Sequence, residues 1–231
     1  LSTIFYRYLA GFIVDSRLNS EHNQSQKAQD ISLKGVIMNI GFTTQEVDCE
    51  AYSSIRSMLL SQRTIFLSQP IDNQTAEEVI AQLLYLDSIN HESVKLIINS
   101  PGGGVSAGFG IIDYMHGIES PVHTHAFGAA ASMAALILTN GEKGYRTASP
   151  STEILIHQPL LNHLSGQVSD IEIATRTLLR TKSKLCTNLV ECTGRTEEEI
   201  DKTIDRDSWF TANEALAFGL IDSIESNVKA A

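Results

Sequence analysis

The sequence predicts an α/β domain. Short apolar segments of strand length alternate with amphipathic segments of helical period, and turns rich in glycine or other small residues separate them. The chain has 231 residues, of which 42% are hydrophobic and 19% are charged, so it can bury a sizeable core and is too apolar to be disordered. These observations favour one globular domain in which strands and helices alternate.

The expected strands are short and mostly apolar, and they lie at residues 63–67, 94–98, 121–126 and 153–156. A capping box at 75–78 opens the first expected helix. The apolar residues that share one face of this helix are Ala76, Val79, Ile80, Leu83 and Leu84. The other expected helices run through Met115, directly after Ser132, from 168 to about 190, from 196 onward, and over 211–218.

The beginning of the chain has a different character. Residues 15–35 are polar, so we predict that residues 1–37 form a flexible extension and that residues 38–231 form the folded domain, with Met38 as one candidate start. The apolar residues 1–14 are interrupted by Arg7 and lack the marks of a secretory signal. The expected location is the cytoplasm, and a remnant of a transit peptide, with an organelle stroma or matrix as the location, is the alternative.

Charge and cysteine usage exclude several classes of function. A net charge of −10 argues against a general affinity for nucleic acid or anionic membranes. The longest apolar stretch, 126–138, is shorter than the ~20 residues of a membrane-spanning helix. Three cysteines without a Cys-x-x-Cys pair predict neither a disulfide framework nor a zinc site, and no other metal or cofactor site is expected.

A run of three glycines, Gly102, Gly103 and Gly104, lies between a strand and a helix. Glycine lets the backbone turn sharply and present N–H groups to an anion or to a peptide carbonyl. An ordinary glycine turn explains the same residues, so this motif alone does not indicate a function.

Ser132 follows three alanines and opens an apolar helix. In the first turn it would lie near free N–H groups and the positive end of the helix dipole, which stabilise a developing oxyanion. The alternative is that Ser132 only caps the helix.

Two further junctions carry residues that could serve a serine nucleophile. His157 ends a strand and is followed by Gln158 and a proline, which would hold an imidazole base in place. Asp207, next to Trp209 and Phe210, could orient that imidazole. A histidine satisfied at a strand end and a loop aspartate are the alternatives, and spacing alone cannot join these residues.

Several motifs together resemble the Clp protease proteolytic subunit in their order and spacing. They are Asn-Ser-Pro-Gly-Gly at 99–103, Ala-Ala-Ser-Met at 130–133, Ile-His-Gln-Pro at 156–159, Gly-Gln at 166–167, Asp-Ile-Glu-Ile at 170–173 and Asp-Arg-Asp at 205–207. The resemblance covers roughly residues 50–225 and implies a crotonase-like fold of repeated strand–strand–helix (ββα) units with a protruding handle helix near 168–190. It also implies two stacked seven-membered rings around a closed chamber, into which a Clp-type AAA+ ATPase feeds unfolded polypeptides.

By motif position, the resemblance implies that Ser132 is the nucleophile, His157 the base and Asp207 the residue that orients it. It makes the chain a serine endopeptidase. ATP would be used by the partner ATPase, so no cofactor is expected in this subunit.

The same resemblance implies further roles. The N–H groups of Gly103 and Met133 would form the oxyanion hole, Gly102 and Gly104 would bind the substrate, and Arg206 would take part in contacts between rings.

The chain also departs from the family pattern. Residues 160–165 replace the usual glycine pair and are one residue longer, which affects peptide alignment and the handle. Ala129 stands where a polar or larger residue is usual. Lys95 and Ile97 replace tyrosines that shape the pocket for the ATPase, so the docking partner is expected to differ. The chain therefore resembles a diverged paralogue, one member of a mixed ring.

Two alternatives remain. The first is a catalytically weak or structural subunit of a mixed Clp core, which the presence of all three triad residues disfavours. The second is a crotonase-type acyl-CoA enzyme, which shares the glycine loop but needs no Ser–His–Asp triad.

Overall fold

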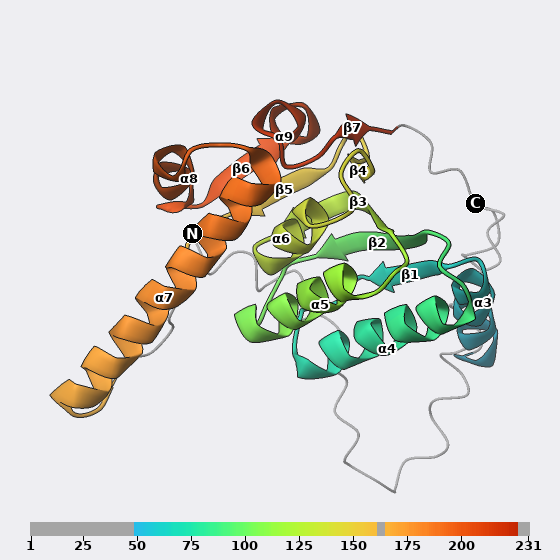
Figure 1. The fold of residues 1–231 in the computed structure, drawn as a ribbon, viewed down its shortest axis with the longest axis horizontal. Coiled ribbons are helices and arrows are strands. Elements are labelled where there is room, and N and C mark those ends of the chain that lie inside the picture. Colours follow the sequence, from blue (N-terminus) through green and yellow to red (C-terminus); the bar gives the residue numbers. More distant parts are fainter. Residues whose placement is uncertain (1–48, 161–164, 226–231) are drawn as a thin grey trace, which may run out of the picture. The chain divides into compact units, whose positions relative to one another are not determined.

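A mainly parallel sheet organises residues 49–160 and 165–225, which are the residues that the computed structural model describes (Figure 1). Its main path has the order β1-β2-β3-β4-β7, and all of these strands are parallel. Beside this path, β5 pairs in parallel with β3, and β6 pairs antiparallel with β5. The predicted α/β fold is therefore confirmed.

The elements of the described residues are short strands joined by helices. The strands are β1 (Thr64–Leu67), β2 (Val94–Ser100), β3 (Val122–Ala131), β4 (Arg146–Ala148), β5 (Glu153–Ile156), β6 (Ser208–Thr211) and β7 (Ser223–Ile224). The helices are α3 (Cys49–Ser61), α4 (Asn73–Ile89), α5 (Val105–Gly117), α6 (Met133–Thr139), α7 (Val168–Thr193), α8 (Glu197–Ile204) and α9 (Ala212–Phe218). The predicted boundary between residues 37 and 38 lies outside the described residues and stays a prediction.

The centre of the sheet is apolar on both faces. In β2, Val94, Leu96, Ile97 and Ile98 are all buried, as is typical of a parallel strand that is covered on both sides. Figure 1 shows α4 and α5 side by side along β1 and β2, and the two helices contact one another. The core thus forms between strands and helices that alternate along the chain.

Helix α4 starts earlier than the sequence predicts. Its N-cap is Asp72, whose side chain accepts a hydrogen bond of 2.8 Å from the Thr75 N–H, so the predicted capping box at 75–78 is wrong. The Thr75 hydroxyl instead donates to the Pro70 carbonyl at 3.0 Å. Leu84 is 45% exposed and was wrongly assigned to the core face, because the buried stripe continues through Leu86.

Strand β3 continues beyond its predicted end at residue 126. Its pairing with β2 shifts register between the pair Ile98–Ala126 and the pair Ser100–Ala130. Gly128 takes a positive φ of 64° within this irregular stretch. The alanines after it belong to the strand and not to a loop, so β3 carries the chain directly to Ser132.

Helix α7 extends from the sheet. The residues that it buries, Leu185, Cys186 and Leu189, all lie near its C-terminal end. Its N-terminal half projects away from the other elements of the domain (Figure 1, orange), which agrees with the predicted handle helix. No helix among the residues described is both long and apolar enough to cross a membrane.

Candidate active site

Ser132 lies at a strained turn between β3 and α6. Its φ of 56° and ψ of −124° are rare for a residue with a side chain, and such strain costs on the order of 1–3 kcal/mol. Its N–H donates to the Leu155 carbonyl on β5 at 2.8 Å, which holds the turn in place. Ser132 occupies the N-cap position of α6, yet its side chain makes no capping hydrogen bond. The capping role therefore does not explain this serine.

His157 follows the end of β5, the strand beside Ser132. In the parallel pairing of β3 and β5, Ala131 lies opposite Leu155, so Ser132 and His157 follow neighbouring strand ends. The His157 Nδ1 lies 2.6 Å from the Gln158 carbonyl oxygen. Because a carbonyl can only accept, Nδ1 carries the proton, and Nε2 is the nitrogen with a free lone pair.

Asp207 immediately precedes β6, on the other side of His157. The antiparallel pairing of β5 and β6 ends with Ile156 opposite Ser208, so His157 and Asp207 are the next residues on their two strands. The Asp207 side chain is exposed. Among the described residues, no hydrogen bond joins Asp207 to His157 or His157 to Ser132. The sheet thus brings Ser132, His157 and Asp207 to neighbouring strand ends. The His157 imidazole is hydrogen-bonded to the Gln158 carbonyl and not to the Asp207 carboxylate.

The glycine loop packs directly against Ser132. Gly102 has a φ of +83°, and a Cβ placed there would lie 2.8 Å from the Ser132 Cβ and 2.9 Å from the Met133 nitrogen. No other residue type fits this position without displacing the serine turn. Gly108 packs equally closely on the Met133 side chain, which is buried.

Hydrogen bonds to Ile71 fix the direction of the glycine loop. The Ile71 N–H donates to the Gly102 carbonyl at 2.8 Å, and the Gly104 N–H donates to the Ile71 carbonyl at 2.7 Å. Gly103 lies between these two bonds and faces the other way. Among the described residues, neither the Gly103 N–H nor the Met133 N–H donates a hydrogen bond.

Two polar residues before the glycine loop hold it in place. The sequence placed both in the motif at 99–103, but neither was assigned a role of its own. The Asn99 Oδ1 accepts a hydrogen bond of 3.1 Å from the Ala129 N–H and fills the space left by Gly128. The buried Ser100 hydroxyl donates to the Gln69 carbonyl at 2.6 Å and lies 3.2 Å from the Gly102 N–H, which donates to it. The sequence signal that could have indicated this role is the position of Asn99 and Ser100, two polar residues at the end of the mostly apolar strand β2.

Arg206 is a surface residue of the turn before β6. Its side chain is 85% exposed, and its Nη1 donates to the Asp205 carbonyl at 3.0 Å. The altered segment predicted at 160–165 lies mostly outside the described residues. In the part of the chain that is described, no group of three or more His, Cys, Asp or Glu side chains could hold a metal ion.

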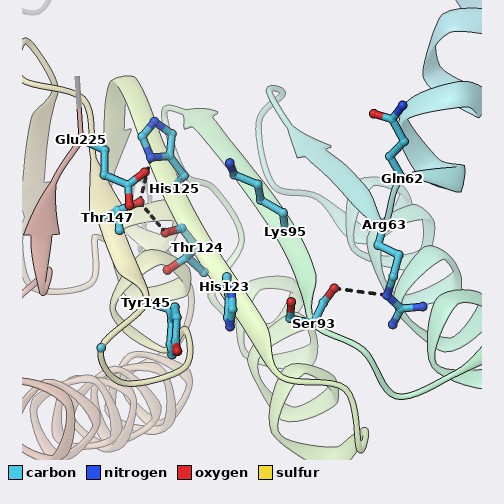
Figure 2. Close-up of a pocket in the computed structure, with 11 residues that line it drawn as sticks. Gln62, Arg63, Ser93, Lys95, His123, Thr124, His125, Tyr145, Thr147 and Glu225 are labelled. Atoms are coloured by element: carbon cyan, nitrogen blue, oxygen red, sulfur yellow. Dashed lines mark hydrogen bonds between the residues drawn. The ribbon is translucent and has the colours of Figure 1, made fainter. Parts of the chain in front are cut away.

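A separate cavity of about 230 Å³ lies near the start of the parallel strands β2 and β3 (Figure 2). Ser132 follows the other end of β3. Lys95 lines it, together with His123 and His125, whereas Ile97 is buried and is not part of the lining. Burial, followed by the nearby Lys95 ammonium, lowers the pKa of His125, although the Glu225 carboxylate acts in the other direction. At Lys95 the cavity is therefore lined by a charged side chain where the family pattern predicts a tyrosine.

The His125 ring is held in one tautomer by its neighbours. The Thr147 hydroxyl lies 3.2 Å from the Thr124 carbonyl, to which it donates, and it therefore accepts from the His125 Nδ1–H at 2.8 Å. The ring is buried and lies near the start of β3, whereas Ser132 follows the end of that strand. This cavity is not part of the candidate active site.

A strained serine between strand and helix, a histidine on the neighbouring strand and a glycine loop with free N–H groups together define a serine-type hydrolase. The sequence model of the family described as Clp protease matches residues 47–228. Over 181 residues the chain is 46% identical to the ATP-dependent Clp protease proteolytic subunit of Porphyromonas gingivalis strain W83, which covers 78% of this chain and 81% of that protein. The chain therefore belongs to the Clp protease family, which confirms the predicted fold and the serine-peptidase activity.

Proposed function

We propose that Ser132 is the nucleophile, His157 the general base and Asp207 the residue that orients the base in the active enzyme. The observation that carries this proposal is the strained Ser132 turn, whose side chain makes no capping bond and whose N–H is tied to β5. Ser132 follows β3, and His157 follows the neighbouring strand β5 with the Nε2 lone pair free. A serine next to a histidine base is the arrangement that acyl transfer requires.

In the proposed reaction, the Ser132 oxygen attacks the carbonyl carbon of a peptide bond while the His157 Nε2 takes the hydroxyl proton. The carbonyl oxygen becomes an oxyanion, which the N–H groups of Gly103 and Met133 stabilise. His157 then gives the proton to the leaving amine as the C–N bond breaks. Water hydrolyses the acyl ester with the same base, which regenerates Ser132.

We assign substrate alignment to the glycine loop by strand addition. Gly102 and Gly104 were predicted to bind the substrate, but the Gly102 carbonyl and the Gly104 N–H bond to Ile71, so we propose that these groups shape the loop. Gly103, which faces the other way, is the residue best placed to pair with an extended peptide. This arrangement suits unfolded polypeptides, because only an extended backbone can pair with a strand edge.

The family and the projecting α7 also support a proposal about assembly. We infer that the subunits form two stacked seven-membered rings, homomeric or mixed, with α7 and Arg206 at the contact between rings. A Clp-type AAA+ ATPase would unfold substrates and consume ATP, so the peptidase subunit itself needs no cofactor. Location in the cytoplasm stays a prediction.

The test compares Ser132→Ala with a control, Ser88→Ala, in which the lost hydroxyl only bonds to the Tyr85 carbonyl of its own helix. Ser132→Ala should lose peptide cleavage by a factor on the order of 10⁶ in kcat, while Ser88→Ala should keep it. Equal turnover by the Ser132→Ala enzyme would refute the assignment. Absence of cleavage in the parent, alone and mixed with a sister subunit, would favour the structural-subunit alternative.

A further inference from the structure

Two pairs of contacts enclose His157 and Asp207. On one side, the ladder of β5 and β6 ends at the pair Ile156–Ser208. On the other side, the next residue after the histidine, Gln158, donates its backbone N–H to the Ile204 carbonyl at 2.7 Å. His157 and Asp207 thus belong to two short facing segments that are tied together at both ends.

The Gln158 side chain adds a second bond at the same end. Its Nε2 donates to the Asp205 carbonyl at 2.8 Å, and it lies 3.5 Å from the Asp205 carboxylate. A further bond spans the turn of residues 205–207, because the Ser208 hydroxyl donates to the Thr203 carbonyl at 2.6 Å. Gln158 therefore holds the turn of residues 205–207 at the end opposite the Ile156–Ser208 pair.

The backbone of Gln158 also acts on the imidazole. Its carbonyl accepts the Nδ1–H of His157 at 2.6 Å, which fixes the tautomer in which Nε2 is the base. One residue thus binds the histidine through its carbonyl and binds the turn of Asp207 through its N–H and its side chain.

We propose that Gln158 is a positioning residue for catalysis, and this inference rests on the proposed roles of His157 and Asp207. Gln158 touches neither substrate nor reacting atoms. Its side-chain bond keeps the turn of residues 205–207 at a distance from which the carboxylate can reach the imidazole. Without that bond only the Gln158 N–H bond to Ile204 joins the two segments beyond Ile156–Ser208, so the turn of residues 205–207 can move and the base loses its orientation.

The test replaces the amide by an apolar group of similar length, Gln158→Met, which keeps both backbone bonds. We expect kcat for a short fluorogenic peptide to fall about 10- to 100-fold, since small displacements of catalytic groups cost this much. KM, particle size and the thermal midpoint should stay at parental values, as they would not if Gln158 only supported the fold. The matched control is Gln82→Met, because the Gln82 Nε2 makes a similar bond of 2.9 Å to the Glu78 carbonyl on α4.

A second variant keeps the test decisive if Gln158→Met fails to assemble. Gln158→Glu has a similar shape, lacks an N–H donor for the Asp205 carbonyl and brings a second carboxylate next to that of Asp205, so a fall in kcat at least as large is expected. In addition, Asp207→Asn should cost less in the Gln158→Met enzyme than in the parent, because the two residues act through one imidazole. Additive losses, or a kcat within about twofold of the parent, would overturn the inference. Failure of the proposed function looks different, because Ser132→Ala would then remain active.

Discussion

Ile156 lies opposite Ser208 in the last pair of the β5–β6 ladder, one residue before His157 and one residue after Asp207. This single pairing brings together two residues that are 50 positions apart in the sequence. Both residues also lie near the end of β3, which stops at Ala131 directly before Ser132, because β5 pairs with β3. The arrangement of the proposed triad is thus a consequence of strand order and register.

His157→Ala and Asp207→Asn should both cripple peptide cleavage. Loss of the base should cost kcat about as much as loss of Ser132, and loss of the orienting carboxylate should cost about 10⁴-fold, because the three residues act as a unit. Steady-state kinetics on a fluorogenic peptide measures both values, with the exposed Asp113→Asn as the control. A loss under tenfold for Asp207→Asn would mean that the Gln158 carbonyl alone orients the imidazole.

Gly102→Ala should inactivate the enzyme and lower its stability. The added Cβ would overlap the Ala131 carbonyl and the Ser132 Cβ, and the φ of +83° is unfavourable for alanine. The control is Gly117→Ala at the end of α5, where a Cβ meets nothing within 4 Å and should have no adverse effect. Thermal unfolding measures the stability of both variants, and peptide cleavage measures their activity. A Gly102→Ala enzyme with parental activity would show that the loop does not need this close approach.

A buried ion pair joins β4 to the segment before β7 and should make stability depend on pH. Arg146, 4% exposed, binds the Asp222 carboxylate through Nε at 2.8 Å and Nη2 at 2.6 Å. Burial acts to raise the pKa of Asp222, but the hydrogen bonds from the Arg146 side chain and from the Arg146 and Gly144 N–H groups outweigh it and hold the pKa below its usual value. The contribution is therefore present above about pH 4 and is lost as the pH falls further and the carboxylate becomes protonated.

Asp222→Asn should destabilise the fold by roughly 3 kcal/mol at pH 7, because it leaves the Arg146 guanidinium buried without its partner charge. Urea unfolding at pH 7 and pH 3 measures the difference between parent and variant, which should shrink at pH 3. Asp201→Asn, which breaks the more exposed pair with Lys182, is the control and should cost less than about 1 kcal/mol. A difference for Asp222→Asn that is equal at both pH values would contradict this account of the pair.

The sequence predicted those elements whose pattern is local. Strand β5 was predicted at its observed bounds because four apolar-rich residues lie between turn signals. A helix was predicted from residue 196 onward, and the structure shows α8 with Thr196 as its N-cap and a capping box with Glu199. The buried face of α4 was predicted only in part. Leu83 and Leu84 are both apolar and both fit the helical spacing, so the sequence pattern did not distinguish them. The burial of each depends on which helix faces the sheet contacts.

The remaining features depend on tertiary pairing. β4, β6 and β7 have two to four residues each, too few to show a periodicity, and they are strands only because a neighbour pairs with them. The extension of β3 to Ala131 depends on a register shift that sequence spacing does not reveal. The contacts of Gln158 depend on the same pairing, since its partners lie 46 and 47 residues away. Residue types alone could therefore nominate Ser132 and His157 but could not show what holds them.

The purified particle should cleave short peptides and leave a stable folded protein intact in the absence of ATP. In the proposed closed chamber, an extended peptide can enter narrow openings and pair with the glycine loop. Unfolding a domain costs about 5–15 kcal/mol, which a peptidase cannot supply. Incubation with a fluorogenic dipeptide and with a folded protein, followed by gel analysis, tests this. Rapid loss of the folded protein would indicate an open active site and would contradict the closed chamber.

The most direct test of the central claim is the mass of the enzyme after reaction with a fluorophosphonate, followed by peptide mapping of the adduct. Our account predicts one adduct per subunit on Ser132, loss of peptide cleavage in proportion to labelling, and no labelling of His157→Ala on the same time scale. An adduct on another residue, or an enzyme that cleaves peptides at the parental rate while Ser132 is fully labelled, would contradict it.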